Sequence, residues 1–279
     1  MSIRRSALMP RRPRQTRVSR SSSLVGALLV ALLALLALAA CGATSGGAST
    51  AGQPGAAPTA TAPAGTATAG ASKVRYVALG ASDAAGVGAS DPNRTAYVPI
   101  IISRLPKGSA ALNLGIDGET LHRALQDELP QAIAAKPTLI TVWLVGNDFK
   151  SCVPLQQYGA DLDTLLTQLQ RQTTAHIFVA NAPDFSALPA VQAQAASGSF
   201  CGAPGSQASI RGLAQQWNQV INASVAAHHD TLVDLFNSDL ASHPGYVASD
   251  GFHPSDQGYL ALANLFWSAI TAQGAAQAA

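Results

Sequence analysis

The sequence from Lys73 onward predicts an α/β fold, in which a five-stranded parallel sheet is doubly wound and covered by helices on both faces. Short apolar runs alternate along the chain with segments of helical periodicity. Strands that are separated by helices pair in parallel, and right-handed crossovers distribute the helices over both faces. The 207 residues from Lys73 to Ala279 carry no internal repeat and suit one domain with a substantial core.

Each predicted element follows from a local pattern of apolar residues. The predicted strands are the apolar runs at 74–79, 111–114, 138–145, 176–180 and 231–235. The predicted helices, with apolar residues three or four apart, are 97–105, 119–134, 158–172, 209–227 and 255–272. The longest stretch with neither signal is 181–207, which we expect to be an irregular loop.

The N-terminal 40 residues have the pattern of a secretory signal. Seven arginines precede Ser21, and the uncharged, Leu/Ala-rich run 24–40 follows them. The sequence Leu38-Ala39-Ala40-Cys41 resembles the bacterial lipobox, in which the signal is cut before a cysteine that is then lipidated. We therefore expect 1–40 to be a lipoprotein signal peptide and Cys41 to anchor the protein on the outer face of the cell membrane. The alternative is an uncleaved transmembrane anchor.

Composition separates the next segment from the globular part. From 42 to 72 the chain contains only small residues, proline and one glutamine, so we expect 41–72 to be the lipidated cysteine and a disordered tether. The domain at 73–279 has ten basic and 15 acidic residues, a net charge of −5, although the whole chain carries +2. This domain lacks the cationic surplus that binding to a phosphate backbone requires, so nucleic acid is not expected as a partner.

Polar residues follow several predicted strands directly. Ser82 follows the first strand, Gly118 lies after the second and Asn147 after the third. Asp250 and His253 stand just before the last helix. Because ligands of open parallel sheets bind beyond the carboxyl ends of the strands, we expect these residues to converge on one edge.

These blocks resemble the SGNH hydrolases, the GDSL-type lipase and esterase family, whose fold is flavodoxin-like. Gly80-Ala81-Ser82-Asp83 resembles the block with the nucleophile, and Val145-Gly146-Asn147-Asp148 resembles the third block. The glycine of the second block is best matched by Gly118, and the Asp-x-x-His block by Asp250 and His253. One departure is Ala81, which stands where the family has an aspartate that helps to fix the nucleophile loop.

The resemblance implies a serine esterase or lipase that hydrolyses carboxylic esters. Ser82 would be the nucleophile, His253 its base and Asp250 the carboxylate that orients the imidazole. The N–H groups of Ser82 and Gly118 and the side-chain amide of Asn147 would form the oxyanion hole. We expect no metal and no organic cofactor, and a monomer that acts on a small-molecule, lipid or acylated-glycan ester.

Other interpretations of the same residues remain open at this point. Ser82 alone is a common helix cap, and 80–84 nearly fits the Gly-x-Ser-x-Gly elbow of α/β-hydrolases, although too few residues precede it for that fold. The run His228-His229-Asp230 is a weak metal candidate. The chain as a whole is alternatively a non-catalytic surface lipoprotein that binds a glycan or peptide, or an acyltransferase with the same triad.

Two cysteines remain once Cys41 is assigned to the anchor. Outside the cytoplasm an even number of thiols is available for one bridge, so we expect a disulfide between Cys152 and Cys201. The alternative is a pair of buried free thiols. A bridge would pin the 181–207 segment beside Asn147.

Overall fold

The computed structural model describes residues 73–277 and contains a five-stranded, wholly parallel sheet. The strands are β1 (Arg75–Gly80), β2 (Ala110–Asn113), β3 (Leu139–Trp143), β4 (His176–Ala180) and β7 (Thr231–Val233), in the spatial order β2-β1-β3-β4-β7. The predicted fold class is confirmed. The predicted signal peptide, Cys41 and the tether lie outside the described residues.

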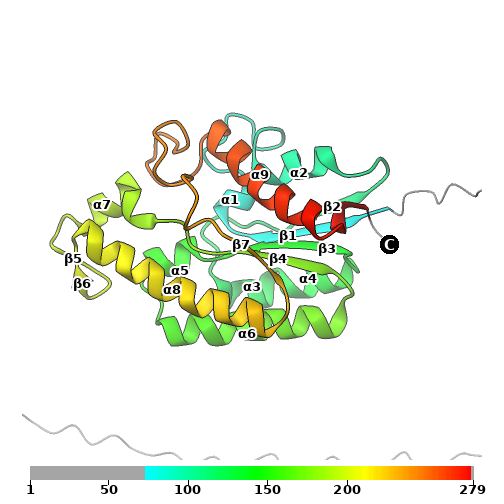
Figure 1. The fold of residues 1–279 in the computed structure, drawn as a ribbon, viewed down its shortest axis with the longest axis horizontal. Helices are drawn as coiled ribbons and strands as arrows, with labels where there is room; N and C mark the ends of the chain where they lie inside the picture. The colour runs from blue at the N-terminus through cyan, green and yellow to red at the C-terminus, as the bar shows by residue number, and fades with distance from the viewer. Residues whose placement is uncertain (1–72, 278–279) are drawn as a thin grey trace, which may run out of the picture. The chain divides into compact units, whose positions relative to one another are not determined.

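Helices cover the two faces of the sheet, as Figure 1 shows. One face carries α2 (Tyr97–Arg104) and α9 (Asp256–Ala272), which pack against each other. The other carries α3 (Leu121–Asp127), α4 (Leu129–Ala134), α6 (Leu155–Gln172) and α8 (Gln207–Ala227). Every residue of β3 is buried, as expected for a central strand that has helices on both sides.

The helix predicted over 119–134 is two helices, α3 and α4, which meet at Glu128. Pro130 is the second residue of α4, a position at which a missing N–H costs nothing. Within a continuous helix the same proline would remove a hydrogen bond and clash with the preceding turn. The periodicity of apolar residues carries on across this break, so the pattern alone did not reveal it.

The segment 181–207 is not an irregular loop, and that expectation was wrong. It contains the 3-10 helix η1 (Phe185–Ala187), α7 (Pro189–Ala195) and a small hairpin of β5 (Ser199–Phe200) and β6 (Ala203–Pro204). These elements are too short to give a periodic signal, and their apolar residues pack into the main core, Val191 and Phe200 among them.

Most apolar residues of α9 are buried as the sequence suggests, including Leu262, Phe266 and Ile270. Leu260 differs, since it is 48% exposed on the outer side of the helix. None of the helices described between 73 and 277 combines the length and the apolar character needed to cross a bilayer.

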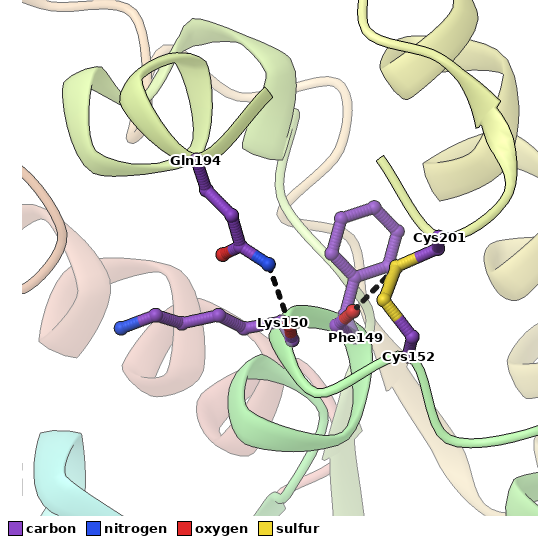
Figure 2. The surroundings of a disulfide bond; sticks show 5 residues. All are labelled: Phe149, Lys150, Cys152, Gln194 and Cys201. Atoms are coloured by element: carbon purple, nitrogen blue, oxygen red, sulfur yellow. Dashed lines mark hydrogen bonds between the residues drawn. A yellow bond between two sulfur atoms is a disulfide. The ribbon is translucent and has the colours of Figure 1, made fainter. Parts of the chain in front are cut away.

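A disulfide between Cys152 and Cys201 joins the end of α5 (Gly146–Lys150) to the turn of the β5–β6 hairpin, with an S–S distance of 2.03 Å and Cα atoms 5.2 Å apart (Figure 2). The Gln194 side chain on α7 donates a hydrogen bond to the carbonyl of Lys150 at 3.1 Å. Together these links fasten the 185–204 segment to α5.

We expect removal of this bridge to destabilise the domain. Cys201→Ser should lower the free energy of unfolding by about 2–4 kcal/mol, because the unfolded chain regains the freedom of a closed loop. Chemical denaturation of the fragment from Lys73 onward measures the change. Cys152→Ser and the double variant serve as controls and should give the same loss, since each removes the same bond. A double variant that loses twice as much would contradict this interpretation.

Candidate active site

The sequence-predicted residues at the strand ends lie at the carboxyl edge of the sheet, next to its topological switch point. After β1 the chain goes to β2 on one side of it, and it then crosses to β3 on the other side. The strand order therefore reverses between β1 and β3, and this is the switch point. Ser82 follows β1 and Asn147 follows β3, which places them on the two strands that flank this point. Open α/β sheets bind ligands there.

Ser82, His253 and Asp250 form one chain of hydrogen bonds. The Oγ of Ser82 lies 2.8 Å from Nε2 of His253, and Nδ1 of His253 lies 2.5 Å from Oδ2 of Asp250. Ser82 is 2% exposed, whereas the Asp250 side chain is 42% exposed. Ala81, rather than Ser82, occupies the cap position of helix α1 (Ser82–Ala85), so the serine hydroxyl does not serve as a helix cap.

A compact turn returns His253 from the far edge of the sheet to β1. Oδ1 of Asp250 accepts hydrogen bonds from the N–H groups of Phe252 and His253, at 2.9 and 3.0 Å. The N–H of Ala248 donates to the His253 carbonyl, and the N–H of Ala190 on α7 donates to the Gly251 carbonyl. The fastened 185–204 segment therefore also supports the turn that carries Asp250 and His253.

Asn147 on α5 and Gly118 on the loop after β2 belong to segments that hydrogen bonds join. The Asn147 amide donates to the Glu119 carbonyl at 2.8 Å, and buried Asp148 accepts the N–H of Leu121 at 3.0 Å. Gly118 has φ +75°, a conformation that favours glycine, although an added Cβ would meet nothing within 4 Å. Backbone conformation rather than space thus requires a glycine at this position.

The loop after β2 approaches helix α1 closely, through residues that the sequence analysis did not single out. The Asn113 amide donates to the Ala84 carbonyl at 2.7 Å, and its oxygen accepts the N–H of Gly115. A Cβ on Gly115 would lie 2.6 Å from that of Ala84. The Asn-x-Gly pattern at the end of a strand is the only local signal for this contact.

A second residue that the sequence analysis missed is Glu128, at the α3–α4 junction. Its side chain is fully buried, and Oε2 accepts the N–H of Gly80 at 2.9 Å. This hydrogen bond lies two residues before Ser82, in the loop whose usual aspartate is replaced by Ala81. The contact joins residues 48 positions apart, so no local pattern could have indicated it.

Burial and hydrogen bonding act in opposite directions on the carboxyl groups around the site. Burial raises the pKa of Asp83 to about 6 and that of Glu128 to about 8. Partial burial also opposes ionisation of Asp250, but hydrogen bonds from the His253 side chain and from two backbone N–H groups outweigh it and lower the pKa of Asp250. Asp250 is therefore the carboxyl that ionises most readily in this group.

The second candidate site, at His228 and His229, does not resemble a metal centre. His228 ends α8 and its Nε2 lies 2.8 Å from a carboxylate oxygen of Asp163 on α6. Across residues 73–277 no three His, Cys, Asp or Glu side chains are grouped in a way that could hold a metal ion.

A serine, a histidine and an aspartate in one hydrogen-bonded chain are the arrangement that serine hydrolases use. The comparisons with known proteins identify the family. Residues 78–261 match the GDSL-like lipase/acylhydrolase family, and the chain belongs to it. A search of curated proteins found no match.

Solved structures share the fold at low sequence identity. TesA is 21% identical with a TM-score of 0.56, over 71% of this chain and 98% of TesA. The psychrotrophic esterase EstA from Pseudoalteromonas sp. is 16% identical with a TM-score of 0.57, over 72% of this chain and 98% of its own. Phospholipase A1 from Streptomyces albidoflavus NA297 is 20% identical with a TM-score of 0.55, over 71% and 100%.

We expect Glu128 to make stability depend on pH. The folded protein keeps this carboxyl protonated up to a pKa of about 8, whereas the unfolded chain releases the proton above its ordinary value of 4.5. Wild-type stability should therefore fall as the pH rises through this interval, by on the order of 1.4 kcal/mol per pH unit. Glu128→Gln keeps an oxygen for the Gly80 N–H and should lose this dependence.

Denaturant unfolding at pH 5 and pH 8 checks this prediction. Glu128→Ala is the contrasting variant, because it leaves the Gly80 N–H without an acceptor and should cost about 1–3 kcal/mol at either pH. If wild type and Glu128→Gln lose the same stability between the two pH values, Glu128 is not the group responsible.

Proposed function

We propose that this protein is an extracytoplasmic carboxylic ester hydrolase that uses Ser82 as nucleophile, His253 as general base and Asp250 as orienting carboxylate. One observation carries the proposal: the continuous chain of hydrogen bonds from the Ser82 hydroxyl through His253 to Asp250. Membership in the GDSL-like lipase/acylhydrolase family supports the reaction class.

In the first step His253 accepts the Ser82 proton at Nε2 while Oγ attacks the ester carbonyl. Asp250 accepts the hydrogen bond from Nδ1, which fixes the tautomer and stabilises the imidazolium. The lowered pKa of Asp250 keeps it ionised for this role. The imidazolium then gives its proton to the departing alcohol oxygen, which leaves an acyl group on Ser82.

The tetrahedral intermediate needs hydrogen-bond donors for its oxyanion. Ser82 is the first residue of α1, so its N–H has no acceptor within the helix. The Gly118 N–H is the second donor. The Asn147 amide has two N–H bonds and spends one on the Glu119 carbonyl, which orients the side chain and leaves the other as the third donor.

In the second step water replaces the alcohol. His253 removes a proton from the water molecule, whose oxygen attacks the acyl carbonyl, and then returns the proton to Ser82 Oγ as the acid departs. The same three donors serve both steps. No step requires a metal or an organic cofactor.

We further propose that the enzyme is held on the outer face of the cell membrane by lipid on Cys41. The lipobox-like Leu38-Ala39-Ala40-Cys41 and the arginine-rich, apolar segment before it support this location. The uncharged residues 42–72 would then link the lipid to the domain.

Deletion of the nucleophile tests the reaction. Ser82→Ala should lower kcat/KM for short-chain esters at least about a thousandfold and abolish labelling by a fluorophosphonate, because no other hydroxyl is activated by His253. Asp250→Ala should retain more activity than His253→Ala. Ser249→Ala removes a hydroxyl from the exposed residue beside Asp250 and should hydrolyse esters like wild type. A folded Ser82→Ala protein with wild-type activity would refute the assignment.

Replacement of Cys41 tests the anchor. In cells that process lipoproteins, Cys41→Ser should remain unprocessed or be released, because no thiol is present to carry lipid. Intact mass and membrane fractionation measure both outcomes. Cys201→Ser is the matched control and should stay lipidated and membrane-bound. Unchanged mass and membrane retention of Cys41→Ser would rule out lipidation at this position.

A further inference from the structure

A small pocket adjoins the proposed active site and contains one unpaired carboxylate. Its volume is about 20 Å³, and Asp83, Gly146, Phe252 and Pro254 are among its lining residues. Asp83 follows Ser82 in the sequence, Gly146 precedes Asn147, and the other two flank His253. The pocket is therefore built from the immediate neighbours of the proposed catalytic groups.

Asp83 is the only ionisable residue that lines this pocket. It is 8% exposed, and the one group that hydrogen-bonds its carboxyl is its own backbone N–H. The other charges that act on it are His253, Asp250 and Asp117. His253 must be neutral to accept a proton from Ser82, so no permanent cation faces Asp83 among the described residues.

An ionised carboxylate in such surroundings is costly unless a cation joins it. The remaining walls are mainly apolar and include the aromatic rings of Trp143, Phe185 and Phe252. Aromatic faces beside a carboxylate suit an ammonium group.

The size of the pocket limits what enters it. A cavity of about 20 Å³ holds roughly one water-sized group, which fits a primary ammonium and excludes a long acyl chain. The residue that follows Ser82 in the chain lines this pocket, and this bears on which side of the ester lies next to it. The alcohol must leave before water attacks, whereas the acyl group stays on Ser82 through both steps, so the acyl group is the part of the ester that remains beside this pocket.

We propose that this pocket binds the ammonium group of an α-amino acyl ester, with Asp83 as its counterion. The proposal rests on the esterase function proposed above and names the substrate class of the same site. An ammonium on the carbon next to the scissile carbonyl would lie within reach of the residue that follows the nucleophile. Asp83 would thereby determine specificity without taking part in the proton transfers.

Two esters of the same shape test the assignment. Alanine ethyl ester and ethyl 2-methylpropanoate differ by an ammonium in place of a methyl group, and at pH 7 the amine is largely protonated. Wild type should prefer the alanine ester by at least about tenfold in kcat/KM, the range expected for a charge-assisted contact. The α-ammonium also activates the ester carbonyl inductively, so part of this ratio is intrinsic to the two esters. Asp83→Asn keeps the side-chain shape and should lower the ratio at least about tenfold from its wild-type value.

Asp117→Asn is the matched control. It removes an exposed negative charge that also acts on Asp83 but does not line the pocket, so it should change the ratio less than about threefold. A loss of activity in Asp83→Asn that is equal for both esters would overturn the proposal, since it would mean that the carboxylate acts on His253 rather than on substrate.

Wild-type protein provides a test that does not depend on folding of a variant. The preference for the alanine ester should weaken below about pH 6, as Asp83 is protonated. Besides His253, Asp250 and Asp117, the phenols of Tyr97 on α2 and Tyr259 on α9 also lie near Asp83, but they stay neutral in this range. Both esters are hydrolysed by the same catalytic groups, so an effect of pH on those groups cancels in the ratio. A constant ratio between pH 5 and pH 7 would therefore contradict the proposal.

The outcomes also separate this proposal from the proposed function. A wild type that hydrolyses the neutral ester as well as the alanine ester would refute the ammonium site and leave the esterase assignment intact. A wild type that hydrolyses neither ester and is not labelled at Ser82 by a fluorophosphonate would refute both.

Discussion

Everything at the candidate site depends on the parallel alignment of the central strands. Because β1, β2 and β3 end at the same edge, the loops after them meet without any long excursion of the chain. The histidine is the exception, since it follows β7 at the far edge of the sheet and must return to β1, a separation of 171 residues from Ser82. The turn around Asp250, supported by α7, makes that return possible.

The buried carboxyl groups near the candidate site include Asp83, Glu128 and Asp148, and these three differ in their hydrogen-bond partners. Glu128 and Asp148 each accept a backbone N–H, of Gly80 and Leu121, and so replace hydrogen bonds that the sheet and helix cannot supply at those ends. Among the described residues, the Asp83 carboxyl accepts a hydrogen bond only from its own backbone N–H. Burial raises the pKa of all three carboxyl groups. Only Glu128 and Asp148 offset the cost of burial with a hydrogen bond to the backbone of another residue. That contrast is the basis of our proposal that Asp83 binds a ligand.

The fold and the order of the site residues could be predicted because they are encoded in local patterns. Apolar runs located the strands to within a few residues, the blocks around Ser82 and Asn147 stood at strand ends, and the block with His253 stood just before the last helix. The short elements between 185 and 204 have too few residues for a periodic signal. Glu128 could not be predicted for a different reason. Its partner, the Gly80 N–H, is 48 residues away in the sequence, and the two meet only because the α3–α4 junction packs against β1.

The proximity of Asp250 and His253 along the chain limits how the site can come apart. Both belong to one four-residue turn whose backbone N–H groups are bonded to the aspartate itself. If that loop shifts, the carboxylate and the imidazole move together, so their relative geometry is preserved. Assembly of the hydrogen-bonded chain of Ser82, His253 and Asp250 then reduces to one coordinate, the separation between Ser82 Oγ and His253 Nε2, which a single spectroscopic probe at the imidazole would report.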